Sequence, residues 1–367
     1  MEKEKIIYIA EFSLPNMSAY AVHVLKMCDN FCKHAKVELI IPYQENSYYF
    51  RKIKKDYLLK KRFKIKSMFS YKRKINLYTR ILFSLKTYFY LNSNNYKMII
   101  SRAIIPSLIL AIMNKKNILE LHSEMTGLTK HLFKFCNLKF INKNLKYILL
   151  HHKLLDILKI RTKNFCILED AVEKNDFDKT NPKTKSFTCA YSGSFSKGKG
   201  LETIYSIAKK APQINFDIFG NIKTLNKDIA LKKVPKNIRF KGFLSYKTIS
   251  NILPRYKVLL MPYQKKVGVL IKEIDVADYF SPLKLFEYMA TGRTIIASDL
   301  KVYSRILRNN YNSIILDPKN TNKWIETIIE IFSSKKYDYL GRNAKKDVKK
   351  YTWENRVNKI ITFSDLF

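Results

Sequence analysis

A short segment rich in glycine and lysine is the first place in this chain where phosphate chemistry is expected. It runs from Tyr191 to Gly200 with the sequence YSGSFSKGKG, follows an apolar run typical of a strand, and precedes a helix-length segment. Backbone amides of such a turn and the N-terminus of the helix can bind a phosphate, with Lys197 or Lys199 adding positive charge. The spacing is neither that of a Walker loop nor G-x-G-x-x-G, so an ordinary strand–helix connection is the alternative interpretation.

A second candidate lies in residues 281–299, SPLKLFEYMATGRTIIASD. Ser281 and Pro282 have the residue types expected at a helix N-cap and first helical position, and Gly292 is typical of a helix end. Glu287 stands inside this otherwise apolar helix. A carboxylate there can accept two hydrogen bonds from vicinal hydroxyls such as those of a ribose, and a solvated surface carboxylate is the alternative.

The distribution of glycine points to the same half of the chain. Seven of the nine glycines lie between Gly193 and Gly292. In a chain with so few glycines, a cluster indicates backbone that turns tightly or approaches a ligand closely. The second half is therefore the predicted place of phosphate binding.

Three other patterns are weaker candidates for chemistry. Residues 176–178 (Asp-Phe-Asp) imitate a metal-binding D-x-D motif but fall in a polar segment instead of at a strand end, and residues 151–152 (His-His) favour a helix start over a metal site. Cys28 and Cys32 would share a helix face without further ligands, so core packing is the preferred interpretation. Neither a metal nor a cofactor is expected.

The elements that must position these residues alternate between β-branched runs and helix-length segments, which is typical of βα units and parallel sheets. Two doubly wound, Rossmann-like α/β domains follow from this pattern, with ligands expected at the carboxyl ends of strands and in the cleft between domains. Helices are predicted at Ala19–Phe31, Leu77–Leu91 and Leu128–Phe140. Strands are predicted at Ile6–Ala10, Val37–Ile41, Met98–Ser101, Ile118–Leu121, Tyr147–Leu150, Thr188–Ser192, Asn215–Phe219, Ile238–Lys241, Val258–Met261, Thr294–Ala297 and Ser313–Leu316.

A polar segment near the middle of the sequence indicates where the two domains are joined. The polar segment Glu173–Ser186 is predicted to be a linker between a first domain over residues 1–172 and a second over residues 187–350. The N-terminal apolar run is too short for a secretion signal, and no apolar stretch reaches the ~20 residues of a spanning helix. We therefore expect a chain without either feature.

Charge is strongly one-sided, with 69 Lys and Arg against 30 Asp and Glu and a net charge of +39. It indicates an anionic partner, although the codon bias of an AT-rich genome is an alternative source for part of it. Residues 51–74 hold twelve Lys or Arg and one Asp among apolar and aromatic residues, which suits an anionic membrane surface; a solvated helix face is the alternative. Nucleic acid is not expected, because the chain shows no helix-turn-helix, RNP or KH motif.

From residue 187 to about residue 320 the chain resembles the donor domain of glycosyltransferase family 4, whose members are retaining enzymes of the GT-B fold. Five blocks match in order and spacing: YSGSFSKGKG, FDIFG, IRFKGFL, VLLMPY and SPLKLFEYMATGRTIIASD. The first half shows a looser similarity in ILELHSE and LEDAV, and YTWENRVNKII resembles the family's final helix. The resemblance implies two Rossmann-like domains facing across a cleft, with residues 351–367 returning to the first domain.

The resemblance also implies roles for particular residues. Lys199 would contact the donor diphosphate, Glu287 would hold the nucleotide ribose, and His122 would lie near the donor sugar. The remaining implied donor contacts are the phosphate loop at Gly193 and Ser194, the helix start at Ser281, Leu283 and Lys284, and the base pocket at Gly242 and Phe243.

Two positions depart from the family pattern. Ser194 stands where the family has an arginine after the first glycine of the loop, and Tyr279 stands where the first glutamate of a pair is expected. Asp278 is the preferred replacement for that glutamate, ahead of Asp275 and Glu273. The first-domain loop SLPNMSAYAVHVL also lacks the family's paired glycines.

The activity that the resemblance implies is a retaining, metal-independent transfer of a hexosyl or N-acetylhexosaminyl group (EC 2.4). The donor would be a nucleotide-sugar, UDP-linked by preference, and the acceptor would be lipid-linked or a polysaccharide or lipopolysaccharide. Lysines and helix-terminal amides would stabilise charge on the departing diphosphate. The expected location is cytoplasmic and peripheral, on the inner face of the cell membrane. A catalytically degenerate sugar-nucleotide-binding protein and a nucleic-acid-binding protein are the alternatives.

Overall fold

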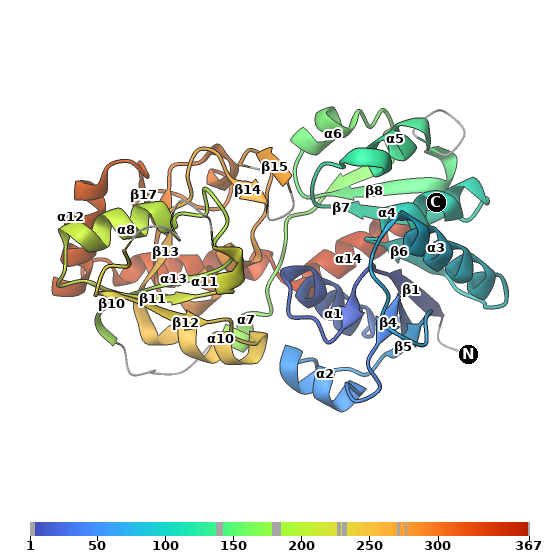
Figure 1. The fold of residues 1–367 in the computed structure, drawn as a ribbon, viewed down its shortest axis with the longest axis horizontal. Helices are drawn as coiled ribbons and strands as arrows, with labels where there is room; N and C mark the ends of the chain where they lie inside the picture. Colours follow the sequence, from blue (N-terminus) through green and yellow to red (C-terminus); the bar gives the residue numbers. More distant parts are fainter. Residues whose placement is uncertain are drawn as a thin grey trace. The chain divides into compact units, whose positions relative to one another are not determined.

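The computed structural model describes residues 4–136, 142–177, 185–225, 229, 233–269, 272–275 and 277–365. The chain forms two compact units (Figure 1). The first comprises Met1–Glu169 with Trp353–Phe367, and the second comprises Asp170–Thr352. Each unit is built around its own parallel sheet.

The first unit is centred on a seven-stranded sheet in the order β5-β3-β1-β6-β7-β8-β9. The strand order reverses at β1, so β1 and β6 flank the switch point where a doubly wound sheet opens at its carboxyl edge. The strands are β1 (Lys5–Ile9), β3 (Lys36–Ile41), β5 (Lys64–Ser67), β6 (Met98–Ser101), β7 (Asn117–Leu121), β8 (Leu145–Leu149) and β9 (Phe165–Ile167), with β2 (Ser13–Leu14) and β4 (Tyr43–Gln44) pairing separately.

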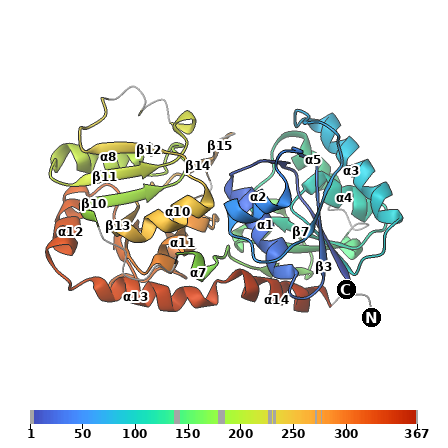
Figure 2. The same ribbon diagram turned by 90° about the horizontal axis from the view of Figure 1, so that it is seen from below.

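Helices cover both faces of this sheet, with α3 packed beside α4 on one face and α1 beside α14 on the other (Figures 1 and 2). The helix α3 starts at a capping box, in which Asn76 accepts the amide of Thr79 and the Thr79 hydroxyl accepts the amide of Asn76. The helices are α1 (Ala19–Phe31), α2 (Phe50–Tyr57), α3 (Leu77–Asn92), α4 (Ile104–Ile112), α5 (Gly127–Cys136), α6 (Lys153–Leu158) and α14 (Trp353–Ser364), with a 3₁₀ turn η1 at Asn142–Asn144.

The second unit repeats the doubly wound arrangement with a six-stranded parallel sheet in the order β12-β11-β10-β13-β16-β17. Its switch point lies between β10 and β13. The strands are β10 (Lys185–Ser192), β11 (Asn215–Phe219), β12 (Ile238–Gly242), β13 (Tyr256–Met261), β16 (Thr294–Ser298) and β17 (Ile314–Leu316), with an antiparallel pair of β14 (Gly268–Val269) and β15 (Lys272–Asp275). The helices are α7 (Lys174–Phe177), α8 (Leu201–Lys210), α10 (Tyr246–Ile252), α11 (Leu283–Thr291), α12 (Thr321–Ser333) and α13 (Asp338–Asp347), with 3₁₀ turns η2 (Ile222–Thr224), η3 (Leu253–Arg255), η4 (Lys301–Tyr303) and η5 (Val348–Lys350).

The predicted α/β class with two doubly wound sheets is confirmed. Several short elements were not predicted, among them the helix α2, the edge strands β5 and β9, and the separate strand pairs β2–β4 and β14–β15. Such short strands carry too little hydrophobic pattern to be recognised. Within the predicted linker, residues 174–177 form α7, where Phe177 is buried against Tyr246, while residues 178–184 lie outside the described residues. Residues 137–140 of the third predicted helix also lie outside them.

Among the residues described, we find no helix that combines the length and the apolar composition of a membrane span.

Candidate functional site

Glycine backbone lines the carboxyl ends of three neighbouring strands in the second unit. The Gly193 amide donates to the Phe219 carbonyl and the Gly220 amide donates to the Gly242 carbonyl, both at 2.9 Å. A Cβ atom built on Gly220 would collide with the Gly193 carbonyl, so only glycine fits there. The glycines thus form a backbone shelf beside the switch point of the sheet, against which the Lys284 amine and the Phe195 ring pack.

The loop from Gly193 to Gly200 packs closely against the segment that follows β13. A Cβ at Gly198 would collide with the Lys266 carbonyl, and one at Gly200, where φ is +99°, would collide with the Pro262 carbonyl. The close packing at Gly198 and Gly200 explains why both residues are glycine, so neither needs a ligand as a further explanation. Their packing nevertheless fixes the position of Lys199, which lies between them.

Two lysines meet over a cluster of aromatic rings at this edge. Lys284 Nζ lies 3.9 Å from the ring centroid of Tyr191 and 4.7 Å from that of Tyr263. Lys199 Nζ lies 5.0 Å from the Tyr263 centroid and 5.4 Å from that of Phe280. Because Lys284 extends from α11 to within 2.5 Å of the position that a Cβ on Gly193 would take, it joins the helix start to the glycine shelf.

The charge of this lysine pair is not balanced locally. Lys284 is buried and its Nζ has no hydrogen-bond partner, and no carboxylate of the described residues forms an ion pair with either lysine. Burial lowers the pKa of Lys199 to about 8. Burial, and then the charge of Lys199, hold the pKa of Lys284 well below its usual range, although Glu287 partly opposes this. An uncompensated, desolvated pair of amines is costly unless an anion joins it.

The start of α11 adds backbone donors beside Lys284. The structure places Pro282 at the N-cap and Leu283 at the first helical position, one residue later than predicted, and no side chain caps the helix. Ser281 does not cap it because its hydroxyl accepts the Asp170 amide instead. The first amides of α11 are therefore available to an anion. Glu287 follows Lys284 by one helical turn and is half-buried, while Gly292 ends the helix with φ +68°, as predicted.

The other sequence-predicted donor residues lie around this edge with different exposure. Gly242 has φ +73° with open space around it, and Phe243 is half-exposed just after β12. The Ser194 carbonyl accepts the Tyr191 hydroxyl at 2.9 Å. Tyr279 is buried and Asp278 is exposed in the turn before α11. Asp275 has a structural role, because one of its oxygens accepts the amides of Val267 and Ala277.

Three aromatic residues of this site were missed at the level of sequence. Tyr191, Tyr263 and Phe280 are buried, and the last two are stacked with their centroids 5.3 Å apart. Tyr263 ends the VLLMPY block and Phe280 precedes the SPLK turn, so their places beside motif residues were the available signal.

In the first unit, His122 is held by a buried carboxylate. It follows β7, and its Nε2 lies 2.7 Å from Glu120 Oε1. The same oxygen lies 2.8 Å from His23 Nε2 of α1 and 2.6 Å from Arg356 Nη2 of α14, and Tyr8 donates to the other oxygen at 2.9 Å. Glu120 thereby fixes the imidazole at the carboxyl edge of the sheet.

The ionisation of Glu120 follows from these contacts. Burial on its own would raise the pKa of the carboxyl. The charges of His23 and Arg356 and the hydrogen bonds from both histidines outweigh burial and hold the pKa well below its usual range. Glu120 is therefore a carboxylate at neutral pH, buried but paired.

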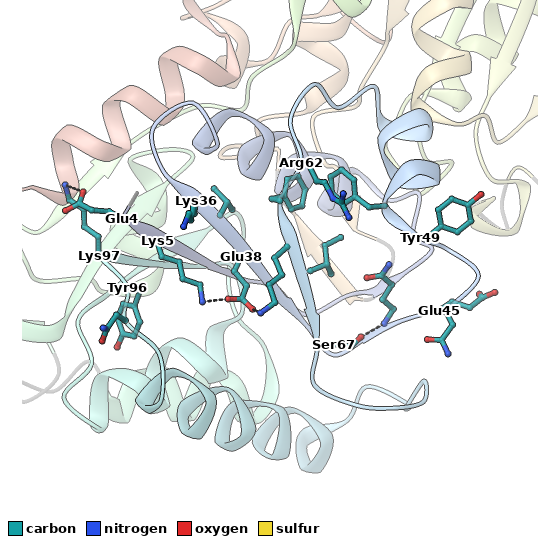
Figure 3. Close-up of a pocket in the computed structure, with 18 residues that line it drawn as sticks. Glu4, Lys5, Lys36, Glu38, Glu45, Tyr49, Arg62, Ser67, Tyr96 and Lys97 are labelled. Atoms are coloured by element: carbon teal, nitrogen blue, oxygen red, sulfur yellow. Dashed lines mark hydrogen bonds and ion pairs between the residues drawn. The ribbon is translucent and has the colours of Figure 1, made fainter. Parts of the chain in front are cut away.

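A cavity of about 1240 Å³ in the first unit contrasts with the lysine site (Figure 3). Its charged groups are largely partnered by one another. Lys5 points to Glu38 and forms an ion pair with it, Lys64 forms a second one at 3.1 Å, and Lys97 pairs with Glu4 at 2.8 Å. Because its lysines already have partners, this cavity is a weaker anion site than the edge of the second unit.

Comparison with known proteins shows what the second unit is similar to. Residues 172–347 match the family model described as Glycosyl transferases group 1. Over 168 residues the chain is 23% identical to the uncharacterized glycosyltransferase MJ1178 of Methanocaldococcus jannaschii. That match covers 45% of this chain and 44% of the relative, so less than half of each protein is compared.

Solved structures are similar over nearly the whole chain. A glycosyltransferase from Rickettsia africae has a TM-score of 0.74 at 12% identity, covering 100% of this chain and 98% of that one. The Anabaena protein Alr3699/HepE, in complex with UDP and glucose, has a TM-score of 0.70 at 11% identity, with 98% of each chain covered. WaaG, a glycosyltransferase involved in lipopolysaccharide biosynthesis, has a TM-score of 0.66 at 10% identity, covering 98% of this chain and 99% of WaaG. The chain therefore has the GT-B fold, and the matched domain and these neighbours support a GT-B glycosyltransferase.

Proposed function

We propose that this chain transfers a sugar from a nucleotide-diphosphate donor, UDP-linked by preference, to a lipid-linked or glycan acceptor. The observation that carries the proposal is the pair of half-buried Lys199 and buried Lys284 at the switch point of the second unit, neither of which forms an ion pair with a carboxylate of the described residues. A diphosphate has the charge and the size to pair with both ammonium groups and with the uncapped amides of α11. Structural neighbours such as Alr3699/HepE were solved with UDP, which supports the same donor class here.

The lysine pair also supports a transfer that needs no metal ion, and retention at the anomeric carbon is proposed on the family resemblance alone. In the transition state, negative charge grows on the leaving diphosphate. Lys199 and Lys284 lie where they would stabilise that charge, a role that divalent cations take in other phosphate sites. The lack of the family's arginine at Ser194 should then weaken diphosphate binding less, because Lys284 brings a cation to Gly193, one residue before Ser194. We propose that His122, which Glu120 orients, contacts the donor sugar.

A thermal-shift screen of the full chain against UDP, GDP and a panel of nucleotide sugars tests the proposed donor class. A ligand at one hundred times its Kd adds about 2.7 kcal/mol of stability, which corresponds to a rise in melting temperature of roughly 5–10 °C for a unit of this size. We expect that rise with UDP and a UDP-sugar. Stabilisation without any hydrolysis or transfer of the sugar would instead favour the catalytically degenerate alternative, which the Ser194 and Tyr279 departures motivate.

The role of Glu287 is tested by changing the protein and the ribose together. We expect Glu287→Gln to weaken UDP binding about tenfold, the effect of one charge-assisted hydrogen bond. Removing the 2′-hydroxyl of UDP should weaken binding to the wild-type protein similarly, yet have little further effect on the variant, because both changes remove one interaction. Fully additive losses, measured by titration calorimetry, would show that Glu287 does not contact the ribose.

The lowered pKa of Lys199 predicts that donor binding depends on pH. Because the free amine loses its proton at about pH 8, the affinity for UDP should fall more steeply above that pH. The other groups around it are Lys284, whose pKa is also lowered, Glu287, and Tyr191 and Tyr263, whose pKa values burial raises so that they keep their protons. Binding measured from pH 7 to pH 9.5 should show this change, and Lys199→Arg, which stays charged, should remove the added slope above pH 8. If UDP affinity depended on pH identically in the wild type and in Lys199→Arg, Lys199 would not be the group whose loss of a proton weakens binding.

A further inference from the structure

The outer face of α3 is unusual for a surface helix because it is almost entirely apolar. The exposed fractions of Tyr78 and Phe89 are 69% and 65%, and Lys86 is the one exposed charged residue on this helix. A helix on the surface of a globular domain normally presents polar side chains to water. The exposed apolar residues are spaced by three or four positions and share one side of the helix: Leu77, Tyr78, Ile81, Leu85 and Phe89.

The opposite side of α3 is firmly packed, so the outer face is not a result of loose docking. Phe83 and Leu91 are buried in a cluster with residues of β1, β3 and β6. Arg80 forms an ion pair with Glu11 at 2.6 Å, just after β1, and donates to the Thr129 hydroxyl of α5 at 3.4 Å. The fold is complete without the outer side chains, which leaves them for a partner.

The stretch of sequence that contains α3 carries charge of a single sign. From residue 57 to residue 119 the chain contains fourteen Lys or Arg and no Asp or Glu. In the loop that leads into α3, Lys72 and Lys74 are exposed beside the exposed apolar residues Tyr71 and Ile75. An apolar helix face bordered by basic residues is complementary to an anionic lipid surface.

The same observation corrects the surface expected from composition. In the segment 51–74 most apolar and aromatic side chains lie in the core and cannot enter a bilayer, among them Ile53, Tyr57, Leu59, Phe63 and Phe69. Within that segment Tyr71 is the large apolar side chain that is well exposed. The well-exposed apolar residues beside this basic stretch lie instead on the following helix, α3.

We propose that residues 71–89 form a docking surface for an anionic lipid bilayer. The apolar side chains of α3 enter the headgroup region, and the lysines at its border contact the acidic headgroups. Arg80 joins the first turn of α3 to Glu11 at the carboxyl edge of the sheet, the edge that also carries His122. This arrangement brings the edge with His122 close to a lipid-linked acceptor, a consequence that rests on the proposed function, whereas the docking itself does not.

Vesicle sedimentation of the full chain tests the proposal. Wild-type protein should sediment with vesicles of phosphatidylcholine containing about one third phosphatidylglycerol, and much less with phosphatidylcholine alone. The double variant Leu85→Asp/Phe89→Asp should bind at least tenfold more weakly. The double variant Ile222→Asp/Val234→Asp changes exposed residues of the second unit by the same charge and should bind as wild type does. Leu85→Met/Phe89→Leu, which keeps the face apolar, should also bind normally.

A fluorescence reporter shows whether this face makes the contact. The two native tryptophans, Trp324 and Trp353, are buried and should not respond to lipid. Phe89→Trp should shift its emission to shorter wavelength on adding the anionic vesicles, whereas Tyr339→Trp on the second unit should not.

Several outcomes would overturn the proposal. They are equal recovery with neutral and anionic vesicles, no recovery with either, unchanged binding of Leu85→Asp/Phe89→Asp, and an unshifted Phe89→Trp emission. A wild-type dimer that Leu85→Asp/Phe89→Asp converts to a monomer without lipid would assign the face to a second copy of the chain. The UDP thermal shift of the same preparations separates failure of docking from failure of donor binding.

Discussion

Replacing Lys284 by methionine is expected to weaken UDP binding about 100-fold and, at the same time, to make the free protein more stable. Losing a buried charge-assisted contact to phosphate costs about 2–3 kcal/mol of binding free energy. In the absence of ligand, however, the Lys284 amine is desolvated, lies beside Lys199 and has no hydrogen-bond partner. Methionine fills the same space without that cost, so the free energy of unfolding should rise.

Lys26→Met is the matched control for this prediction. Lys26 is also buried, but its Nζ donates to the Leu58 carbonyl at 3.1 Å in the first unit. The same substitution there should lower the melting temperature and leave UDP binding unchanged. If Lys284→Met lowered the melting temperature as Lys26→Met does and bound UDP normally, Lys284 would be a structural residue and not a donor contact.

The second large effect is expected at Glu120. Glu120→Gln keeps the shape of the side chain but leaves His23 and Arg356 without the carboxylate that pairs with them. Breaking a buried ion pair costs about 3–5 kcal/mol of stability, which corresponds to a fall in melting temperature on the order of 10 °C for a unit of this size. Turnover should fall further than the loss of folded protein explains, because His122 loses the group that orients it.

Glu38→Gln is the control that separates the loss of stability from the loss of turnover. Glu38 is a buried carboxylate of the same unit, paired with Lys5 and Lys64 and hydrogen-bonded by Tyr90. That variant should lose stability but keep the turnover of its folded fraction. Normal turnover per folded molecule of Glu120→Gln would show that catalysis does not depend on the orientation of His122 by Glu120.

The depressed pKa of Glu120 adds a dependence on pH to this prediction. A carboxyl whose folded pKa lies below its unfolded value contributes stability that is present above about pH 4.3 and is lost as the pH falls through the folded pKa. The difference in stability between wild type and Glu120→Gln should therefore be largest near neutral pH and shrink below pH 4. Urea unfolding at a series of pH values measures it, and a constant difference would contradict the ionised state of Glu120.

The sequence predicted the fold well because the central strands of both sheets are buried on both faces. Met98–Ser101 and Asn215–Phe219 match their predicted bounds, since continuous apolar runs between polar segments leave few alternatives. The edge strand β5, with the sequence KIKS, carries no such run and was missed. Its pairing with β3 alone gives it little hydrophobic pattern.

The site was predictable only where one motif holds all the information. The loop at Lys199 and the helix with Glu287 stand out because glycines and caps leave marks in the local sequence. The side chain of Lys284 was expected only as part of a helix start, and its approach to Gly193 and Tyr191 depends on packing between distant segments. The contacts of Glu120 also depend on packing between distant segments, because they join four elements, and no local sequence pattern predicts them.

The face of α3 shows a different limit. Its period predicted a helix at Leu77–Leu91, which the structure confirms at Leu77–Asn92. A helix with apolar residues on several sides gives no indication of which side is buried. Only the structure shows that Phe83 and Leu91 pack inward and that Tyr78 and Phe89 remain exposed.

The central claim is that Lys199 and Lys284 form a diphosphate site, and titration calorimetry of UDP at pH 7.5 tests it most directly. Measured in two buffers with different ionisation enthalpies, UDP binding to the wild-type protein should take up protons, because the bound diphosphate returns charge to amines whose pKa values are lowered in the free protein. Lys284→Met should bind about 100-fold more weakly with less proton uptake. Binding of equal strength in both proteins with no proton uptake, or no binding of UDP or GDP to the wild type, would contradict the account.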